Sequence, residues 1–559
     1  MSTRFLQREH PSEHRTRRTP NDTKRKMPSS KTYSKSDPAK HMSSTLLDLC
    51  QVHTNHTVEF RESATTTTLS HFAVDLRLVA TAIMGAIGSM IPNIDPKTTI
   101  AVDALRCELR LYDFQLTALN GVPNHVRLGW WKQRRIYPLL SSLWQYWWGR
   151  IPFWKVVPLA VIPATTFSGF YRCRDVHTVF VFFNVYNPDD CRQFTQTLES
   201  LGVRSRPDLQ AFTASHTAEE VEQWLGYFAT MVRTPEEWRR LRPDVTAAPI
   251  RISQIQTGLR IDLATLGSLP LSGLKVVDFS KVVAGPYCGR LLSDLGADVL
   301  QVRNPNGVHV PMVDTYASTG KRSTFLDLTV DHDRDAARKL LAVADVVITS
   351  FPLLEQANRL GIGPDSMSER RPFIHLNVSA YPSDSRWAGR KGYAPMAAAA
   401  SGLFYTAVGP EGLKAATTST DATLWPCDGY PEDYFTGLLG CAAILAALHQ
   451  RSQHGGSYLV ETSLAAGCEW VATQSISVPT PLTAQQITSN FQDFEHCAKQ
   501  LQRSSPTPWT GGSLSTIPSP ISIPGFATLG LYTSVPVLGS SPPTFVPPFH
   551  GENDSQTTS

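Results

Sequence analysis

Asp433 has the setting in this sequence that most directly suggests chemistry. It precedes an apolar run, Tyr434 to Leu448, in which Thr436 and Gly437 complete a D-x-x-T-G spacing. The run is rich in Leu, Ala and Ile and predicts a helix. A carboxylate at a helix start can accept hydrogen bonds from the free amides of the first turn, which makes it an ordinary cap. The same place suits a nucleophile, because the positive end of the helix dipole keeps a carboxylate ionised and stabilises an oxyanion beside it. These residues alone leave both roles open.

Patterns for metal and dinucleotide chemistry are missing from the sequence. No H-E-x-x-H occurs, and the one H-x-x-x-H, His10 to His14, contains a proline. The nine cysteines form no C-x-x-C pair, so neither a zinc site nor a disulfide framework is indicated. The stretch SKVVAGPYCG (280–289) lacks the G-x-G-x-x-G of dinucleotide-binding turns. We therefore expect no metal and no permanently bound cofactor.

The net charge of +4 is unevenly distributed. Residues 1–41 hold eleven Lys and Arg against four Asp and Glu, so the rest of the chain is not basic. A polar, basic segment with few aromatic residues is typical of a solvated tail, and we expect no nucleic-acid partner. The apolar segments Leu78–Ile91 and Val156–Ile162 are shorter than the roughly 20 residues that a membrane span needs. We therefore expect no membrane partner and a cytoplasmic protein, with a mitochondrial location left open.

From about Leu271, strand patterns alternate with helix patterns. LKVVDF (274–279) reads as a strand, AGPYCGRLLSDLGA (284–297) as a helix and DVLQVR (298–303) as a second strand. Further strands are expected at 323–328, 345–351 and 373–379, with helices at 333–344 and before Leu360. Such alternation predicts an α/β fold with a parallel, helix-covered, Rossmann-like sheet whose ligand meets the carboxyl ends of the strands.

The two ends of the chain have a different composition. Residues 1–45 are polar and charged, and residues 476–559 are rich in Pro, Ser and Thr without sustained periodicity. Such segments have little apolar surface to bury, so we expect a disordered basic tail and a low-complexity tail.

The region from Leu271 to Gln474 resembles the class III CoA-transferases, the CaiB/BaiF family. The resemblance rests on GLKVVDFSKVVAGPYCGRLLSDLGADVLQV, KRSTFLDL, ADVVITSF followed by NRLGI, GYAPMAAAASGLFYTAVG, and DYFTGLLGCAAILAALHQRSQHGGSYLVETSL. The order and spacing of these motifs also agree with the family. The resemblance implies that coenzyme A is a substrate and that residues 266–475 form the catalytic half.

The resemblance also implies roles for single residues. The acid of the family's D-x-x-T/S-G motif is the nucleophile, which corresponds to Asp433, with Thr436 and Gly437 at the helix start beside the oxyanion. An ordinary carboxyl pKa of about 3.9 would leave Asp433 ionised at neutral pH. The positions that match the family's CoA contacts are Val283, Ala284, Lys321, Arg322, Ser350, Phe351, Arg359, Gly392 and Tyr393. The three cations among them suit phosphate groups, although each is also compatible with a solvated surface charge.

The chain departs from the family's pattern at several places. Gln301-Val302-Arg303 stands where many relatives have Lys-Ile/Val-Glu, so pocket contacts are expected to differ. The racemase branch uses a His in a G-H-D segment, and the matching residues here are Gly392-Tyr393-Ala394. One base of the racemase pair is thus missing, which disfavours that reaction.

The first half of the chain resembles the part of the family that normally follows the catalytic half. Residues 169–241 are similar to its smaller C-terminal domain, and IAVDALRCEL (100–109) echoes YLVETSLAAGCEW (458–470). Residues 46–265 are therefore expected to be a degenerate C-terminal-half-like region placed before the catalytic half.

Together these features predict an acyl-CoA:carboxylic acid CoA-transferase that works through an aspartyl anhydride and thioester. The partners would be an acyl-CoA and a carboxylic acid, and a homodimer is expected because family members pair. The alternative is a catalytically impaired relative that acts as a binding or scaffold protein.

Overall fold

A sheet of seven strands, in the order β11-β10-β9-β12-β13-β14-β8, forms the centre of the region from β8 to β14. Six strands run parallel, and β8 pairs antiparallel with β14 at one edge. The inner strands are short Val- and Ile-rich runs, buried as is typical of a parallel sheet. The bounds are β8 Ile250–Gln256, β9 Lys275–Asp278, β10 Asp298–Arg303, β11 Arg322–Phe325, β12 Val346–Thr349, β13 Ile374–Ser379 and β14 Ser457–Ser463.

This sheet belongs to a computed structural model that describes part of the chain. All described residues lie in one unit. They are residues 38–54, 56–61, 75–92, 94–111, 118–119, 122–123, 167–182, 188–242, 248–261, 268–307, 314, 316–367, 371–418, 430–474, 498–499, 501–506, 513–526, 529–530 and 539–545.

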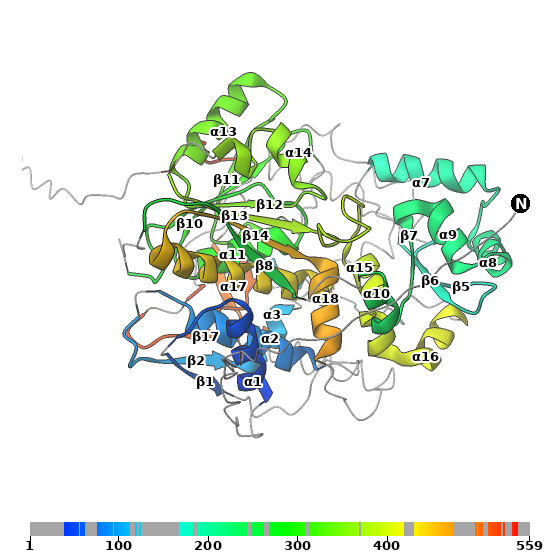
Figure 1. Ribbon diagram of the computed structural model, residues 1–559, viewed down its shortest axis with the longest axis horizontal. Helices are drawn as coiled ribbons and strands as arrows, with labels where there is room; N and C mark the ends of the chain where they lie inside the picture. Colours follow the sequence, from blue (N-terminus) through cyan, green and yellow to red (C-terminus); the bar gives the residue numbers. More distant parts are fainter. Residues whose placement is uncertain are drawn as a thin grey trace, which may run out of the picture. The chain divides into compact units, whose positions relative to one another are not determined.

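Helices cover both faces of the sheet (Figure 1). α11 and α17 share a core with Val276 and Ile348, whereas α13 and α14 share a core with Val277 and Val347. Neighbouring residues of one strand thus face opposite helix layers. The parallel, helix-covered sheet predicted from the sequence is confirmed. The helices of this half are α11 Ala284–Asp294, α13 Asp331–Val343, α14 Leu354–Arg359, η5 Pro364–Met367, α15 Ala394–Ser401, α16 Leu403–Thr418, α17 Pro431–His454 and α18 Leu464–Thr473.

The strand order reverses between β9 and β12. β9 is the first of the six parallel strands in the chain, with β10 and β11 on one side and β12, β13 and β14 on the other. The connections that leave the carboxyl ends of β9 and β12 therefore diverge, and ligands of open α/β sheets bind at such a switch point. The residues that follow these two strands, Phe279–Val283 and Ser350–Leu353, define the place where a ligand is expected.

A smaller α/β layer precedes this sheet in the chain. β5, β6 and β7 form an antiparallel sheet, and Phe194, Leu209 and Val221 pack against it in a core of their own. This is the smaller α/β domain that the sequence predicts within 169–241. Its elements are β5 Gly169–Arg172, β6 Thr178–Val181, α7 Pro188–Ser200, α8 Arg206–Ser215, α9 Ala218–Leu225, η4 Gly226–Phe228, β7 Ala229–Met231 and α10 Pro235–Arg240.

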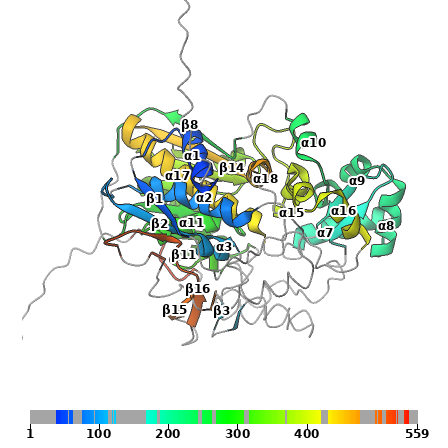
Figure 2. The ribbon, with the colours of Figure 1, turned by 90° about the horizontal axis from the view of Figure 1, so that it is seen from below.

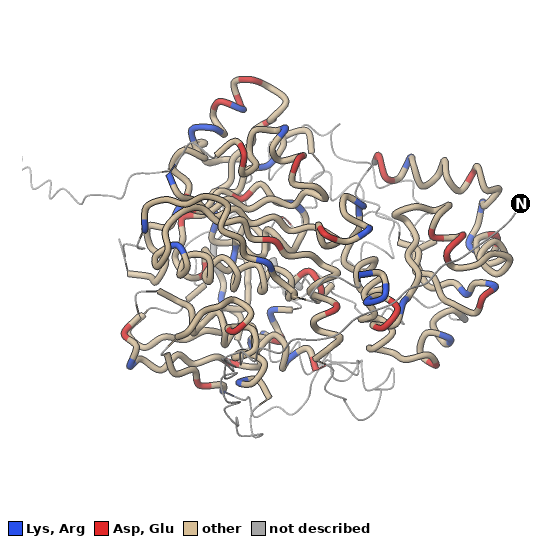
Figure 3. The backbone as a smooth tube through the Cα atoms, in the orientation of Figure 1, with Lys and Arg blue, Asp and Glu red and all other residues tan. Residues whose placement is uncertain are grey.

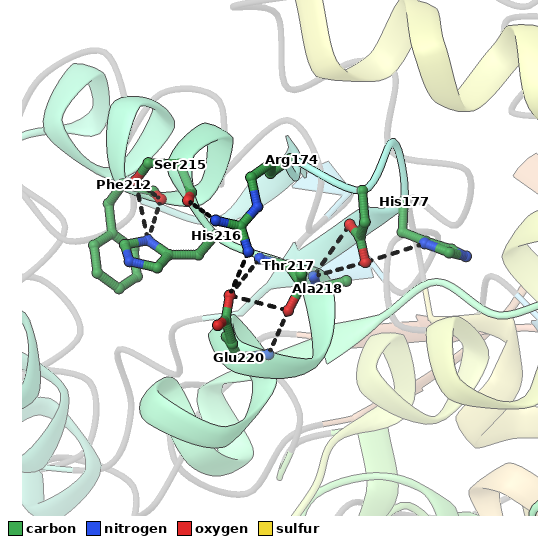
Figure 4. Close-up of polar contacts among 9 residues, drawn as sticks. Arg174, His177, Phe212, Ser215, His216, Thr217, Ala218 and Glu220 are labelled. Atoms are coloured by element: carbon green, nitrogen blue, oxygen red, sulfur yellow. Dashed lines mark hydrogen bonds and ion pairs between the residues drawn. The ribbon is translucent and has the colours of Figure 1, made fainter.

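Polar caps fix the junction of α8 and α9 in the smaller layer (Figure 4). The Thr217 hydroxyl accepts from the Glu220 amide, and the Glu220 carboxylate accepts from the Thr217 amide at 2.8 Å. Arg174 from the β5–β6 hairpin donates to the Ser215 carbonyl at 3.2 Å and pairs with Glu220 at 3.5 Å. Such links stabilise helices that are too short to form alone.

The N-terminal region forms a third sheet, β1-β2-β17. Its helix α2 packs against α17 and shares the large core beneath the seven-stranded sheet (Figures 1 and 2). Arg110 of α3 forms a buried ion pair with Asp294 of α11, which joins the two regions further. The elements are α1 Pro38–Leu49, β1 Thr57–Arg61, α2 Leu76–Ser89, β2 Thr99–Asp103, α3 Ala104–Leu111 and, from the far end of the chain, β17 Ile521–Ser522.

Described parts of both expected tails have regular structure. α1 begins at Pro38, inside the segment 1–45. In the segment 476–559, β17 pairs with β2, and a fourth sheet has the order β15-β16-β3-β4 (Figure 2). The expectation of unstructured tails is wrong for these residues, because open sheet edges offer backbone partners even to short polar strands. The strands are β3 Ala118–Leu119, β4 Val122–Pro123, β15 Arg503–Pro506 and β16 Ser513–Thr516.

Charged residues of both signs are spread over the described chain, with no single-sign face in the view of Figure 3. No helix among the described residues is both long and apolar enough to cross a bilayer. The described His, Cys, Asp and Glu side chains form no cluster suited to a metal ion.

Candidate active site

Two helix starts meet at Asp433. The carboxylate of Asp433, in the first turn of α17, accepts a hydrogen bond from the backbone amide of Ala284, the first residue of α11. The close approach depends on Gly437, because a Cβ atom there would lie 2.7 Å from the Ala284 carbonyl oxygen and 2.9 Å from the Tyr287 ring. The positive ends of two helix dipoles thus point toward one carboxylate.

Asp433 is not the N-cap of α17. The N-cap is Tyr430, which has a left-handed backbone (φ 56°) and makes no side-chain cap. Pro431 starts the helix, where its missing N–H is no loss, and Asp433 is the third residue. Its carboxylate is therefore available to a group from another element, and Ala284 supplies that group.

Burial raises the pKa of the Asp433 carboxyl well above its ordinary value, and the neighbouring Glu432 raises the pKa further. The Ala284 amide opposes both effects because it stabilises the anion. The expectation of an ordinary pKa for Asp433 is therefore wrong. Glu432 is fully buried, whereas Asp433 is half-buried and keeps part of its surface accessible. The sequence shows the adjacent acids but not their burial.

Thr436 supports the helix start. Its hydroxyl donates to the Glu432 carbonyl oxygen at 2.7 Å, and its side chain is buried. A Cβ atom at Gly467 of α18 would lie 3.0 Å from the Thr436 hydroxyl, so α18 packs closely there. Thr436 thus holds the backbone of the first turn, and its hydroxyl does not bond the Asp433 side chain.

The turns after β9 and β12 come together at the switch point. The Lys281 amide donates to the Ser350 hydroxyl at 2.9 Å. Val282, between Lys281 and Val283, has φ 66°, a rare conformation for a β-branched residue, and its side chain is 46% exposed. Strain of this kind concentrates at functional sites.

Phe351 is held beside this turn by Asn377. The Phe351 amide donates to the Asn377 side-chain oxygen, and the Asn377 side chain donates back to the Phe351 carbonyl, both at 3.0 Å. The structure therefore brings together four of the residues predicted to contact CoA, which are Val283, Ala284, Ser350 and Phe351.

Lys321 lies inside the protein. Its ammonium donates to Asp278 at 2.8 Å and to the Pro286 carbonyl at 2.6 Å, and both side chains of the ion pair are fully buried. Burial lowers the pKa of Lys321, while Asp278 raises it. A phosphate contact through Lys321 would require this pair to open, so Lys321 is a structural cation in this arrangement.

Arg322 lies apart from the switch point, and Arg359 is exposed. Arg322 starts β11 and donates to both oxygens of Asp298, the first residue of β10, at 2.9 Å. This pair therefore sits toward the amino ends of the strands, whereas Asp433 and Ser350 lie at the carboxyl ends. Arg359 is exposed in the last turn of α14. Of these two cations, the structure pairs Arg322 with a carboxylate other than Asp433.

Gly392 and Tyr393 face the smaller layer. The Tyr393 hydroxyl donates to Asp190 of α7 at 2.6 Å, and Asp190 also accepts from Tyr227 at 2.8 Å. A Cβ atom at Gly392 would lie 2.8 Å from the Tyr381 ring, so the segment is tightly packed. These contacts tie the residues before α15 to a domain that precedes them in the chain.

Residues 271–501 match the model of CoA-transferase family III. This region of the chain, less than half of its length, is therefore similar to CoA-transferase family III. The match includes Asp433 and all nine positions expected to contact CoA, and it ends after the first residues of the segment expected to be a low-complexity tail.

Curated relatives of the family III region carry transferase names. The chain is 32% identical over 208 residues to the acetyl-coenzyme A transferase nodX of Hypoxylon pulicicidum, covering 36% of this chain and 33% of that protein. It is 33% identical over 215 residues to the succinyl-CoA–L-malate CoA-transferase beta subunit of Chloroflexus aurantiacus, covering 36% and 50%. The chain thus spans a third to a half of the length of these relatives.

A solved structure of a CaiB/BaiF family protein from Brucella suis is 28% identical, with coverage of 37% of this chain and 56% of that chain and a TM-score of 0.32.

Two features of the family III region were missed from the sequence. Arg303 donates to the Ser280 carbonyl and pairs with Asp314, both at 2.9 Å, and so holds the turn after β9 from behind. The sequence shows that Gln301–Arg303 departs from the family's pattern, but it does not show which groups Arg303 contacts. Glu432 was missed because a second acid beside Asp433 looks like another first-turn charge until its burial is known.

Proposed function

We propose that this protein is an acyl-CoA:carboxylic acid CoA-transferase with Asp433 as its nucleophile. The observation that supports this most is the hydrogen bond from Ala284 to the Asp433 carboxylate at the switch point of a family III sheet. An acid held by the amide of a neighbouring helix, and not used to cap its own, is placed for attack on a bound group. The relatives' names support transfer of CoA, and the identity of the acyl group is left to experiment.

In this mechanism, the Asp433 carboxylate attacks the thioester carbonyl of a donor acyl-CoA. The C–S bond breaks, which gives a mixed anhydride and the CoA thiolate. The thiolate then attacks the aspartyl carbonyl, releases the donor carboxylate and forms an aspartyl-CoA thioester. An acceptor carboxylate reverses the two steps and leaves as the new acyl-CoA.

The chain's own groups assist each step. The helix starts of α11 and α17 direct backbone amides at the carboxylate, where they can stabilise each oxyanion that forms on the aspartyl carbon. The raised pKa means that a smaller fraction of Asp433 is in the anionic, nucleophilic form at a given pH. A bound thioester carbonyl offers no charge of its own, so the anionic form depends on the two helix dipoles and the Ala284 amide.

One observation favours the alternative of a binding or scaffold protein. A carboxyl whose pKa is raised by burial and by a second buried acid spends more of its time protonated, and a protonated acid is no nucleophile. For a racemase, the Tyr393 hydroxyl would have to face Asp433, yet it bonds Asp190. A homodimer and a cytoplasmic location remain our predictions for the assembled protein.

The decisive experiment traps the intermediate. The protein is incubated with a panel of acyl-CoA donors and free carboxylic acids, and CoA exchange is followed by mass spectrometry. Hydroxylamine added during turnover should leave a hydroxamate on the peptide that carries Asp433, because it attacks anhydrides and thioesters. Exchange without any adduct on Asp433, or CoA binding without exchange under any donor, would contradict the proposal.

A further inference from the structure

The charges around the turn after β9 are balanced with one exception. Asp278 and Lys321 form one buried pair, and Arg303 and Asp314 form a second. Lys281, in the same turn, is exposed and has no ion-pair partner among the described residues. Its positive charge is thus the uncompensated one at this turn, within the part of the chain that the structure describes.

The backbone of Lys281 is fixed although its side chain is exposed. Its amide bonds the Ser350 hydroxyl, and the preceding carbonyl, that of Ser280, accepts from Arg303. The next residue, Val282, is held in a left-handed conformation. Because the backbone of Lys281 is already fixed on both sides, only its side chain has to become ordered when an anion binds. This reduces the conformational entropy lost on binding.

We propose that Lys281 binds a phosphate group of CoA, in the role that the resemblance gave to Lys321 and Arg322. This inference rests on the proposed function, because it places CoA across the switch point with its sulfur at Asp433. It assigns the cation that recognises the nucleotide end of the substrate.

The separation along the chain suits the shape of CoA. Ala284 bonds Asp433, and Lys281 lies three residues before Ala284, a distance of at most about 10 Å for an extended backbone. The long lysine side chain extends this reach further. In CoA the pantetheine arm separates the thiol from the diphosphate, so a cation some way from the nucleophile is where a phosphate would lie.

The electrostatics of Lys281 agree with an anionic ligand. Although the side chain is exposed at the surface, partial desolvation of its ammonium lowers the pKa of Lys281, and the nearby Arg303 lowers the pKa further. A phosphate beside the ammonium would reverse that effect, since an opposite charge stabilises the charged form. Phosphate binding and full protonation of Lys281 therefore reinforce each other.

Binding measurements on the full chain test this assignment. Calorimetry with CoA, dephospho-CoA and pantetheine compares the parent with Lys281→Met and with Lys339→Met, an exposed lysine of α13 that serves as the matched control. Loss of one charge-assisted contact should weaken CoA binding by Lys281→Met about tenfold. Pantetheine, which has no diphosphate or 3′-phosphate, should show no such penalty, and Lys339→Met should bind all three like the parent.

Each outcome decides for or against Lys281. A penalty that persists with dephospho-CoA supports contact with the diphosphate, and one confined to CoA supports contact with the 3′-phosphate. Parental CoA affinity in a folded Lys281→Met protein, or an equal penalty on pantetheine, would overturn the inference and leave the proposed function standing. If the parent binds CoA but never transfers it, the proposed function fails and the same titrations still judge Lys281.

Discussion

Helices α2 and α17 have matching surroundings in two different regions of the chain. Asp75 precedes α2 and Asp433 lies in the first turn of α17, and the strand that follows begins at the same sequence distance from each acid, at Thr99 and at Ser457. β2 has a parallel neighbour, β1, and an antiparallel one, β17, just as β14 lies between β13 and β8. A helix, α3 or α18, then follows each strand.

The two acids nevertheless have different partners. Asp75 is the N-cap of α2, and its side chain accepts from the Leu78 amide of its own helix at 3.0 Å. Asp433 lies within the first turn and accepts from Ala284 of another helix. In this chain, the acid that precedes its apolar helix caps that helix, whereas the acid inside the first turn accepts from the amide of a neighbouring helix.

The largest expected effect is the difference in CoA transfer between the Asn variants of the two acids. Asp433→Asn should lower CoA transfer by about a thousandfold or more, because an amide cannot form the anhydride. Asp75→Asn should leave transfer unchanged, because Asn caps as well as Asp. Exchange rates from mass spectrometry, with CoA binding as the folding control, check both variants. Equal rates for the parent and Asp433→Asn would return Asp433 to a structural role.

The same variant carries a stability prediction. A folded-state pKa above the unfolded value of about 3.9 means that Asp433 costs stability as pH rises from the unfolded pKa through the raised one. Asp433→Asn removes this cost, so its Tm at neutral pH should equal or exceed that of the parent. At a pH below the unfolded value the advantage should vanish. A clear loss of Tm at neutral pH would contradict the raised pKa.

A second pair of variants tests the helix approach. A methyl group at Gly437 would meet the Ala284 carbonyl, so Gly437→Ala should push α11 away from α17, at about 1–3 kcal/mol of stability and about a hundredfold in transfer. Gly88→Ala in α2 is the control, because a Cβ there meets the side-chain methyl of Ile100 at 3.2 Å, which can yield. Near-parental transfer by Gly437→Ala would show that the α11 amide is not needed.

The pH profile of transfer tests the effect of Glu432 on the pKa of Asp433. No acidic residue stands next to Asp75. Activity should fall as pH drops through the raised pKa of Asp433, because the protonated acid cannot attack. Glu432→Gln removes the negative charge that helps to raise this pKa, so the acidic limb of kcat/KM should move to lower pH. An unmoved limb in a folded, active variant would assign the raised pKa to burial alone.

The smallest effect concerns the cap itself. Asp75→Ala should cost about 1 kcal/mol of unfolding free energy, the usual value of a lost N-cap. Transfer should not change, because α2 carries no group of the site. Chemical denaturation measures the first quantity and the exchange assay the second. A large loss of transfer without a loss of stability would mean that the N-terminal region takes part in catalysis.

The sequence predicted the central sheet well because its strands and helices are coded locally. The runs at 274–279, 298–303 and 373–379 became β9, β10 and β13, and the reversal that places a ligand follows from their order alone. The resemblance pointed to Asp433, Val283 and Ser350 because it carries spacing and order, and their roles stay predictions. These features depend on residues close together in the chain.

Features that the sequence does not show depend on residues far apart in the chain. Lys321 and Arg322 are predicted phosphate contacts, and their carboxylate partners in the structure lie 43 and 24 residues away. The burial that raises the pKa of Asp433 comes from the packing of helices far apart in the chain. Short strands such as β15 and β17 have no periodicity to detect, and they form because distant strands present open edges.

The edge strand β11 forms hydrogen bonds with residues that are synthesised long after it. Gly539 and Ser541 bond the backbone and hydroxyl of Ser323, and Arg322 donates to the Thr544 carbonyl at 2.7 Å. During translation, at roughly 5–20 residues per second, the seven-stranded sheet therefore emerges with one edge open for many seconds. A nascent chain in that state exposes a template for pairing with other nascent chains. Yield on expression should consequently depend on chaperone supply and on an intact segment 539–545, even where the purified protein is stable.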